Sequence, residues 1–272
     1  TITDDDISTL VVQDTAATEG DPAANGLISI QLTGRSDRAI DVSCSLFAGT
    51  AVAGSNPGED YTDATTLISI PAFTQGVTLR DIVITNDLVT ELTETFNVTC
   101  TEVSGGIAGV ADDTGIVTIS DNDASSVTIA PGTAVESLVD NNLISVTMSG
   151  VADRRVNLTC TLTAGTAQPG SGPGEDYHND VFQFTFAPFT EGTQVADLVL
   201  NDDAIDEVQE QLTYACTETT ASVLTGAIAS ETLTIDDNDT AELCAVATAY
   251  GEASGSPPFV EVTLSIPSDR PV

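Results

Sequence analysis

Apolar and polar residues alternate along much of this chain. In the segment 39–47, Val42, Cys44 and Leu46 alternate with Ser43 and Ser45, and the segments 94–101 and 156–164 follow the same rule. A period of two residues turns one side of a β-strand towards a core and the other towards solvent. No segment shows the period of an amphipathic helix. The pattern therefore predicts an all-β protein with no helices of note.

Clusters of turn-forming residues, such as the segment 34–38, separate the apolar runs. Between them we expect seven strands in the first part of the chain, over 9–15, 27–33, 39–47, 65–71, 77–85, 94–101 and 115–120. Seven short strands in a unit of this length indicate an Ig-like, seven-stranded antiparallel β-sandwich.

The sequence repeats itself. The segment 48–61 returns with few changes as 164–177, and Tyr61 and Tyr177 are 116 residues apart. The same offset relates Cys44 to Cys160 and the Asp-Asn-Asp triplet 121–123 to 237–239. We therefore expect tandem sandwiches, divided into the end of a preceding repeat (1–6), two full repeats (7–123 and 124–239) and the first two strands of a further, incomplete repeat (240–272). The missing strands of the incomplete repeat come either from more of the same chain or from another copy.

The net charge of the chain excludes several kinds of binding partner. The chain has 42 Asp and Glu against 6 basic residues, all of them Arg, so its formal net charge is −36. Such a chain repels nucleic acid and anionic membranes, and no apolar run approaches the roughly 18 residues of a membrane span. Apolar residues still make up 41% of the chain, which is enough to fill cores. The chain begins at Thr1 with neither Met nor a signal peptide, which indicates a segment of a larger protein.

The acidic residues gather in particular loops. In a sandwich, the loops after the first, third, fifth and seventh strands lie at one end, and each of these loops carries carboxylates in both repeats. Carboxylates that converge there would repel one another, and Ca²⁺, which takes roughly 6–8 oxygen ligands, relieves that repulsion. The alternative is a solvated acidic surface without a bound ion. Recurrence in four loops of two repeats favours calcium.

Several of these segments resemble the Calx-beta domain family, which includes the regulatory region of sodium/calcium exchangers and many large microbial surface proteins. The resemblance covers the whole chain and rests on Thr18-Glu19-Gly20 and on the segments 53–61, 86–96 and 119–123. It implies a seven-stranded sandwich that binds calcium at the end carrying these loops.

By position, the resemblance implies one set of calcium ligands in each repeat. These are Glu19, Asp60, Asp87, Glu91, Glu94, Asp121 and Asp123 in the first repeat, and Glu136, Asp176, Asp202, Asp203, Glu207, Glu210, Asp237 and Asp239 in the second. The chain departs from the family pattern at Asn86, where members often carry Asp, at the central Asn of both final triplets, and at Ser137, which follows Glu136 where Gly20 follows Glu19. These departures leave the number of ions per repeat open.

Five of the six arginines lie in the turn between the second and third strands, at the end opposite the acids: Arg35, Arg38, Arg154, Arg155 and Arg270. Head-to-tail stacking of the repeats would bring this turn towards the acidic end of the preceding repeat. Our hypothesis is that these arginines neutralise charge at the junction. The alternative is that they are exposed turn residues that contribute little.

The cysteines also follow the repeat. Cys44 and Cys100 occupy inward positions of two strands that are neighbours in an Ig-like sheet, as do Cys160 and Cys216. We expect one cross-strand disulfide in each repeat, with buried free thiols as the alternative. An acidic, Lys-free, calcium-binding chain with disulfides indicates a secreted or cell-surface protein. Cys244 has no equivalent in the two full repeats and falls outside this scheme.

Nothing in the sequence indicates an enzyme. The only histidine, His178, has Thr62 at the equivalent position of the first repeat, and we interpret it as a solvated loop residue rather than a metal ligand. The sequence has no nucleophile elbow, glycine-rich phosphate loop or basic–aromatic patch. Glycosylation sequons begin at Asn97, Asn157 and Asn238.

The sequence thus predicts a calcium-binding structural segment of a large secreted or cell-surface protein. Calcium would stiffen the junctions between repeats, and the segment would serve reach, adhesion or assembly of an extracellular filament, with neighbouring repeats or further copies of itself as partners. The alternative is a calcium sensor that controls a transporter, as in sodium/calcium exchangers, and a third hypothesis is an accessory region beside an enzyme. Sub-micromolar calcium affinity suits a sensor, whereas dissociation constants of about 10⁻⁴–10⁻³ M suit an extracellular module.

Overall fold

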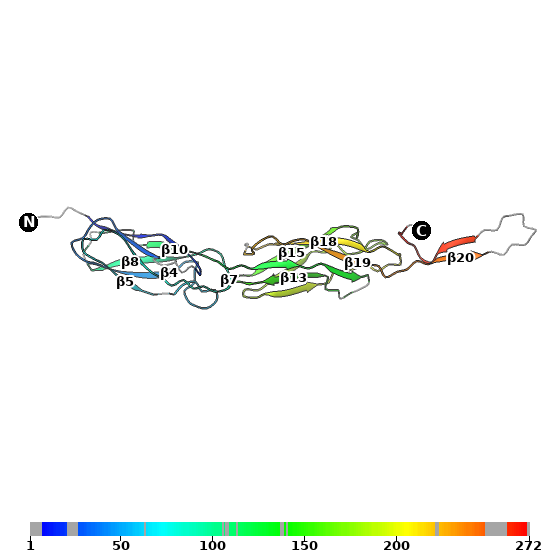
Figure 1. The fold of residues 1–272 in the computed structure, drawn as a ribbon, viewed down its shortest axis with the longest axis horizontal. Helices are drawn as coiled ribbons and strands as arrows, with labels where there is room; N and C mark the ends of the chain where they lie inside the picture. Colours follow the sequence, from blue (N-terminus) through cyan, green and yellow to red (C-terminus); the bar gives the residue numbers. More distant parts are fainter. Residues whose placement is uncertain are drawn as a thin grey trace, which may run out of the picture. The chain divides into compact units, whose positions relative to one another are not determined.

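A computed structural model of the chain forms two compact units (Figure 1). It describes residues 7–20, 27–62, 64–104, 106, 109–112, 114–136, 139, 141–220, 223–247 and 260–270. The first unit comprises Thr1–Ser125 with Gly150–Arg154, and the second comprises Ser126–Ser149 with Arg155–Val272. In these described ranges every regular element is a β-strand, so the predicted all-β fold is confirmed. None of the described residues forms a helix of the length and apolarity that crossing a bilayer requires.

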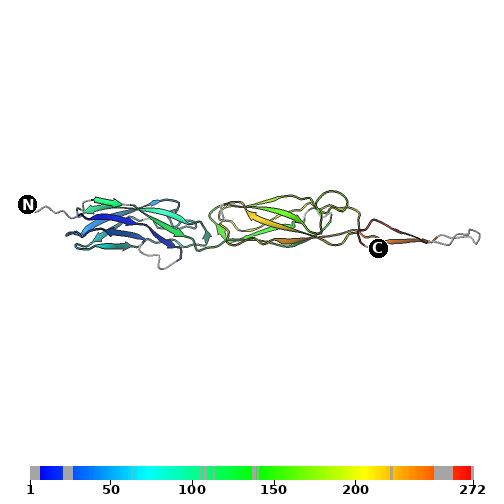
Figure 2. The same ribbon diagram turned by 90° about the horizontal axis from the view of Figure 1, so that it is seen from above.

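The first unit is a sandwich whose strands run lengthwise between its two ends (Figures 1 and 2). Its strands are β1 (Thr9–Gln13), β2 (Thr15–Thr18), β3 (Ile28–Leu32), β4 (Ile40–Ala48), β5 (Thr66–Ile70), β6 (Gly76–Arg80), β7 (Val89–Thr90), β8 (Glu94–Ser104), β9 (Gly109–Asp112), β10 (Thr114–Ser120) and β14 (Val151–Ala152). One sheet has the order β6-β3-β1-β9 and the other β2-β10-β8-β4-β5. The short strand β14 pairs in parallel with β7.

The second unit repeats this plan. Its strands are β11 (Ser126–Ile129), β12 (Gly132–Val135), β13 (Ile144–Ser149), β15 (Val156–Ala164), β16 (Phe182–Phe186), β17 (Gly192–Ala196), β18 (Glu210–Glu218), β19 (Glu231–Asp236), β20 (Leu243–Ala247) and β21 (Val260–Leu264). A sheet of order β11-β13-β17 faces one of order β12-β19-β18-β15-β16. Within the described residues, β20 and β21 pair only with each other.

The first predicted strand, 9–15, differs from the structure. It forms two strands, because β1 pairs with β3 in one sheet while β2 pairs with β10 in the other. Asp14 lies at the crossing point, and its carboxylate accepts a hydrogen bond of 2.8 Å from the backbone N of Ile116. The β1–β9, β10–β2 and β12–β19 pairs are parallel. The sandwich is therefore antiparallel in its centre, with parallel pairs at its edges that the alternation of residues did not predict.

The inward positions of both sheets form the core. Leu10, Ile30, Val42 and Phe96 are all completely or almost completely buried. Tyr61, from the loop after β4, stacks on Phe96 with ring centroids 4.1 Å apart. The rings close the core directly beneath the loops at one end of the first unit. The loop that carries Asp60 is thereby anchored to the sandwich.

A disulfide joins the two central strands of the larger sheet in each unit. Cys44 and Cys100 lie directly opposite each other on β4 and β8 and are bonded, as are Cys160 and Cys216 on β15 and β18. All four cysteines are buried. Cys244, on β20, is an exposed free thiol.

Candidate metal centres

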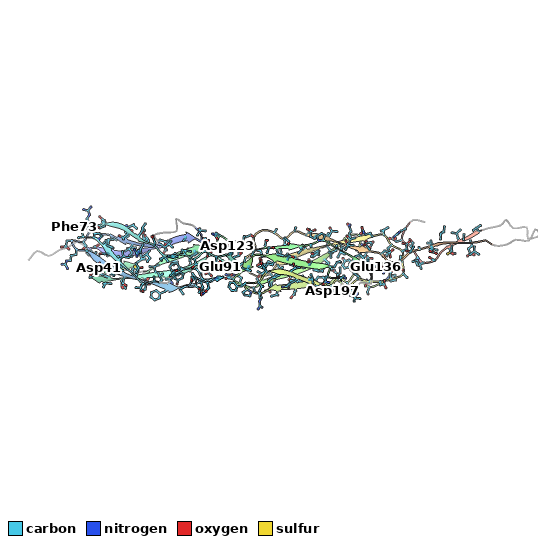
Figure 3. The ribbon with its side chains drawn as sticks, turned by 60° about the horizontal axis from the view of Figure 1, so that its bottom comes forward. Asp41, Phe73, Glu91, Asp123, Glu136 and Asp197 are labelled. Carbon is cyan, nitrogen blue, oxygen red and sulfur yellow. A yellow bond between two sulfur atoms is a disulfide. The ribbon has the colours of Figure 1, made fainter. Side chains whose placement is uncertain are left out.

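One end of the first unit gathers acidic side chains from four loops. Glu19 follows β2, Asp60 lies between β4 and β5, Glu91 follows β7, and Asp121 and Asp123 follow β10. Figure 3 shows Glu91 and Asp123 at one end of this unit, with Asp41 and Phe73 at the other. The strand order thus brings together carboxylates that are far apart in the sequence.

These carboxylates form two overlapping triads in each unit. In the first unit, one ligand atom from each of Glu19, Asp121 and Asp123 lies within 4.8 Å of the others, and so do atoms of Glu19, Asp60 and Glu91. The triads of the second unit are Glu136, Asp237 and Asp239, and Glu136, Asp176 and Glu207. Because the two triads share one glutamate, each centre offers two adjacent positions for a cation.

Backbone donors hold the aspartates of the first centre in place. Asp60 Oδ2 accepts from the backbone N of Val52 at 2.6 Å. Asp121 accepts from the backbone N of Glu91 and of Asp123, both at 2.8 Å. Each bond ties one acidic loop to itself or to another loop, so the arrangement is built into the fold.

The second centre repeats these bonds almost atom for atom. Asp176 Oδ2 accepts from the backbone N of Gln168 at 2.6 Å. Asp237 accepts from the backbone N of Glu207 and of Asp239, both at 2.8 Å. The same scaffold at both centres indicates that the geometry follows from the repeated sequence.

Four carboxylate oxygens in these centres are buried without any hydrogen-bond partner. They are Glu19 Oε2, Asp123 Oδ2, Glu136 Oε2 and Asp239 Oδ2. Glu19 and Glu136 are each only 4% exposed. A buried anionic oxygen with no donor is strongly unfavourable, so it requires a proton or a cation. The residues fit calcium, because every donor in the triads is a carboxylate oxygen and Ca²⁺ prefers such ligands.

Burial, followed by the neighbouring carboxylates, raises the pKa values of the glutamates. The pKa rises from 4.5 to about 7 for Glu19 and to about 8 for Glu136. For Glu91 it rises to about 9, and for Glu207 to about 7, again first because of burial and then because of nearby acids. The folded chain without an ion therefore holds protons near neutral pH that a bound cation would displace.

The remaining predicted ligands surround the triads. Asp87 accepts from the backbone N of Gly58 at 2.6 Å and Asp203 from that of Gly174 at 2.8 Å. Burial, followed by the neighbouring carboxyl group of Asp60, raises the pKa of Glu94 to about 7. Burial, followed by Asp176, raises the pKa of Glu210 to about 8. Asp202 is exposed and accepts from the Asn238 side chain at 3.0 Å.

The structure also places one arginine against the second centre. Arg270 Nε donates to the carbonyl O of Glu207 at 3.0 Å, and its Nη2 lies 3.2 Å from Asp206 Oδ1 and 3.7 Å from Asp237 Oδ2. Asp206 is not among the predicted ligands, and Thr90 occupies the equivalent position in the first repeat. Arg154, the equivalent of Arg270, pairs instead with its neighbour Asp153 at 2.7 Å.

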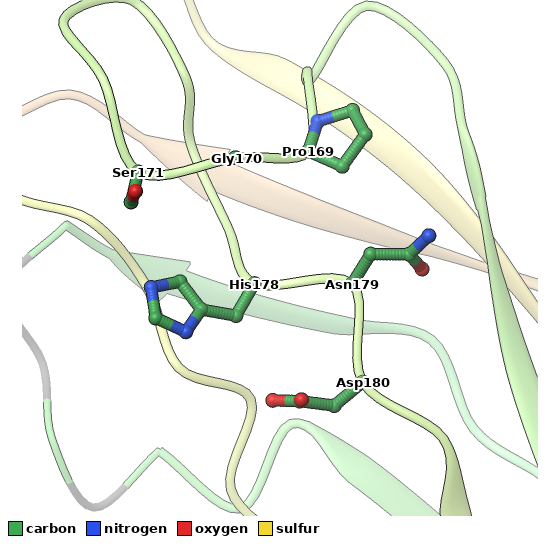
Figure 4. Close-up of a pocket in the computed structure, with 6 residues that line it drawn as sticks. All are labelled: Pro169, Gly170, Ser171, His178, Asn179 and Asp180. Carbon is green, nitrogen blue, oxygen red and sulfur yellow. The ribbon is translucent and has the colours of Figure 1, made fainter.

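A separate hollow of about 500 Å³ lies in the second unit (Figure 4). Two arms of one loop line it, with Pro169, Gly170 and Ser171 on one side and His178, Asn179 and Asp180 on the other. His178 is exposed, and no candidate metal group found among the described residues includes it. The hollow therefore adds no ligand to the acidic centres.

Comparisons with known proteins add a likeness of fold. No family model matches the chain, and no curated protein matches it. Among solved structures, the chain is similar to CBD12 from CALX1.2, at 15% identity and a TM-score of 0.36, covering 84% of this chain and 99% of that one. The apo-form Calx CBD1 domain matches at 20% identity and a TM-score of 0.36, covering 43% and 100%. Calcium binding domain CBD12 of CALX1.1 matches at 15% identity and a TM-score of 0.34, covering 83% and 97%.

Proposed function

We propose that each unit is a calcium-binding module of a non-catalytic structural protein. The observation that carries the proposal is the buried, partnerless carboxylate oxygen of Glu19 and of Glu136 at the centre of oxygen-only triads. A bound Ca²⁺ would supply the positive charge that these oxygens lack. The loop carboxylates would bind the ion, and their bonds to backbone N–H groups would keep them oriented towards it.

We further propose that calcium stiffens the chain where one repeat follows another, as expected in a secreted or cell-surface protein that provides reach, adhesion or filament assembly. The acidic loops lie where the last strand of each repeat ends, so an ion there would bind the exit of one repeat. The Arg270 contacts with Asp206 and Asp237 support the hypothesis that arginines offset charge at this position. The two disulfides are consistent with an oxidising compartment. The repeat boundaries at 7–123 and 124–239 remain part of this proposal.

The test is calcium titration of the whole chain by calorimetry, together with thermal unfolding and small-angle scattering in calcium and in chelator. Wild type should bind ions in both units and should melt at higher temperature with calcium. The matched variants Glu19→Gln and Glu136→Gln should each abolish binding at one centre only. The proposal would be rejected if calcium changed neither the unfolding temperature nor the scattering profile.

The same titration separates a structural module from a sensor. Dissociation constants of about 10⁻⁴–10⁻³ M fit an extracellular structural module, because extracellular calcium is abundant. Sub-micromolar constants would instead support the calcium-sensor alternative, in which binding controls a transporter. A reversal of Arg154 and Arg155 to Glu tests the junction hypothesis, since it should increase bending in the scattering profile. An unchanged scattering profile would contradict the hypothesis that these arginines neutralise charge at the junction.

A further inference from the structure

The central residue of each Asp-Asn-Asp triplet uses its side-chain NH₂ group to bond to two oxygens of other loops. In the first unit, Asn122 Nδ2 donates to the carbonyl O of Glu19 at 2.8 Å and to Asn86 Oδ1 at 3.0 Å. In the second unit, Asn238 Nδ2 donates to the carbonyl O of Glu136 at 3.3 Å and to Asp202 Oδ1 at 3.0 Å. In both units this NH₂ group therefore joins two loops. One is the turn that carries Glu19 or Glu136, here called the glutamate turn, and the other is the loop that carries Asn86 or Asp202.

The chemistry of this contact requires a donor. Both partners of Asn122 are oxygens, a backbone carbonyl and a side-chain carbonyl, and neither has a hydrogen to give. A carboxylate at this position would set an anionic oxygen against the carbonyl O of Glu19. An amide NH₂ group satisfies both acceptors and adds no negative charge to a cluster that already holds an excess of carboxylates.

A backbone hydrogen bond also holds the turn that carries Glu19. The backbone N of Glu19 donates to the O of Ser120 at 3.0 Å, which ties the turn to the end of β10. Gly20 follows with a φ of +64°, and a Cβ there would lie only 2.5 Å from Asn122 Nδ2. Glycine at position 20 thus provides both the left-handed backbone and the space for the Asn122 amide.

We propose that Asn122 and Asn238 are positioning residues of the candidate metal centres. Each side-chain amide fastens the turn that carries the shared glutamate, Glu19 or Glu136, and so directs that carboxylate towards both cation positions. The asparagines themselves do not bind the ion. The calcium part of this inference rests on the proposed function, whereas the fastening of the turn does not.

The test uses Asn122→Asp, which keeps the size of the side chain but replaces the donor by an oxygen. Calcium binding is measured by calorimetry in a Glu136→Gln background, so that the titration reports the first centre. We expect about tenfold weaker binding with an unchanged number of ions, the effect of losing roughly one hydrogen bond. In chelator, the Glu19 amide hydrogen should exchange faster with solvent, because the turn opens more often.

The matched control is Asn86→Asp, which reproduces the Asp–Asn pairing that the second unit already has and keeps the Asn122 donor. It should bind calcium no more weakly than wild type and should leave Glu19 exchange unchanged. Asn238→Asp, with Glu19→Gln as background, repeats the test in the second unit and guards against a folding defect peculiar to the first.

Two results would overturn the inference. An additional bound ion or tighter binding in Asn122→Asp would show that position 122 is a ligand position. Unchanged exchange of the Glu19 amide in that variant would show that the side chain does not hold the turn. If wild type bound no calcium, the proposed function would fail, but the exchange comparison of Asn122→Asp with Asn86→Asp would still decide whether the asparagine fastens the turn.

Discussion

Replacement of Glu136 by Gln should stabilise the second unit without calcium, and this advantage should disappear when calcium is bound. Glu136 is 4% exposed, one of its oxygens has no partner, and its pKa rises from 4.5 to about 8, chiefly through burial. Gln has nearly the same shape and resembles the protonated acid. The variant therefore removes the charge from the centre without creating a cavity.

The magnitude follows from proton linkage. Because the pKa of Glu136 is higher in the folded chain than its ordinary 4.5, the folded state binds a proton that the unfolded state has released. This contribution to stability is complete below about pH 4.5 and is lost as the pH rises through about 8. Stability falls with each pH unit between the ordinary pKa of 4.5 and pH 7, an interval of about 2.5 units. At pH 7 the free energy of unfolding is therefore lower by on the order of 3 kcal/mol than in acid. Glu136→Gln avoids this loss.

The assay is thermal and urea unfolding of both proteins at pH 7, in chelator and in calcium at about 100 times its dissociation constant. In chelator, the second unit of Glu136→Gln should be more stable by on the order of 3 kcal/mol, or roughly 10 °C. In calcium the two proteins should become nearly equal in stability, because wild type gains about 2.7 kcal/mol when the ion is at 100 times its dissociation constant and the variant gains little.

Glu242→Gln provides the control, since it removes an exposed carboxylate that belongs to no triad. It should change stability little in either condition. The reasoning would be refuted if Glu136→Gln were less stable than wild type in chelator, because the carboxylate would then stabilise the fold in its charged form.

Three further predictions concern other parts of the molecule. Without calcium, wild type should lose stability between about pH 4.5 and 9, because burial raises the pKa values of Glu19 to about 7 and of Glu91 to about 9. Urea unfolding at a series of pH values checks this, and saturating calcium should remove the loss. Tyr214→Phe should destabilise the second unit by about 1 kcal/mol, since the hydroxyl accepts from Ala130 N at 3.0 Å and lies within hydrogen-bond distance of the carbonyl O of Ala130 and of Ser145. Unchanged urea unfolding of the second unit would contradict this. Replacing Cys44 and Cys100 together by Ala should cost the first unit about 4 kcal/mol, given the chain length between the two cysteines, as measured by urea unfolding against wild type.

The alternation of apolar and polar residues by itself determined the positions of most strands and the fold class. A period of two around Val42, Cys44 and Leu46 is sufficient to predict a half-buried strand, because neighbouring side chains on a strand always point to opposite sides. The internal repeat then identified equivalent acids and cysteines without any structure. The all-β sandwich, the opposed cysteines and the gathering of acids at one end followed from these local rules.

Only the tertiary structure decided which polar groups have hydrogen-bond partners and which have none. The alternation cannot show that the segment 9–15 divides between two sheets, because both halves have the same local pattern and differ only in their neighbours. The Asn122 contact with Glu19 and the Arg270 contact with Asp206 likewise join residues that are far apart in the sequence. The burial of the Glu19 oxygen without a partner is also a result of the packing in space. Burial and hydrogen bonding depend on what packs against a group in space, and a linear sequence does not state that.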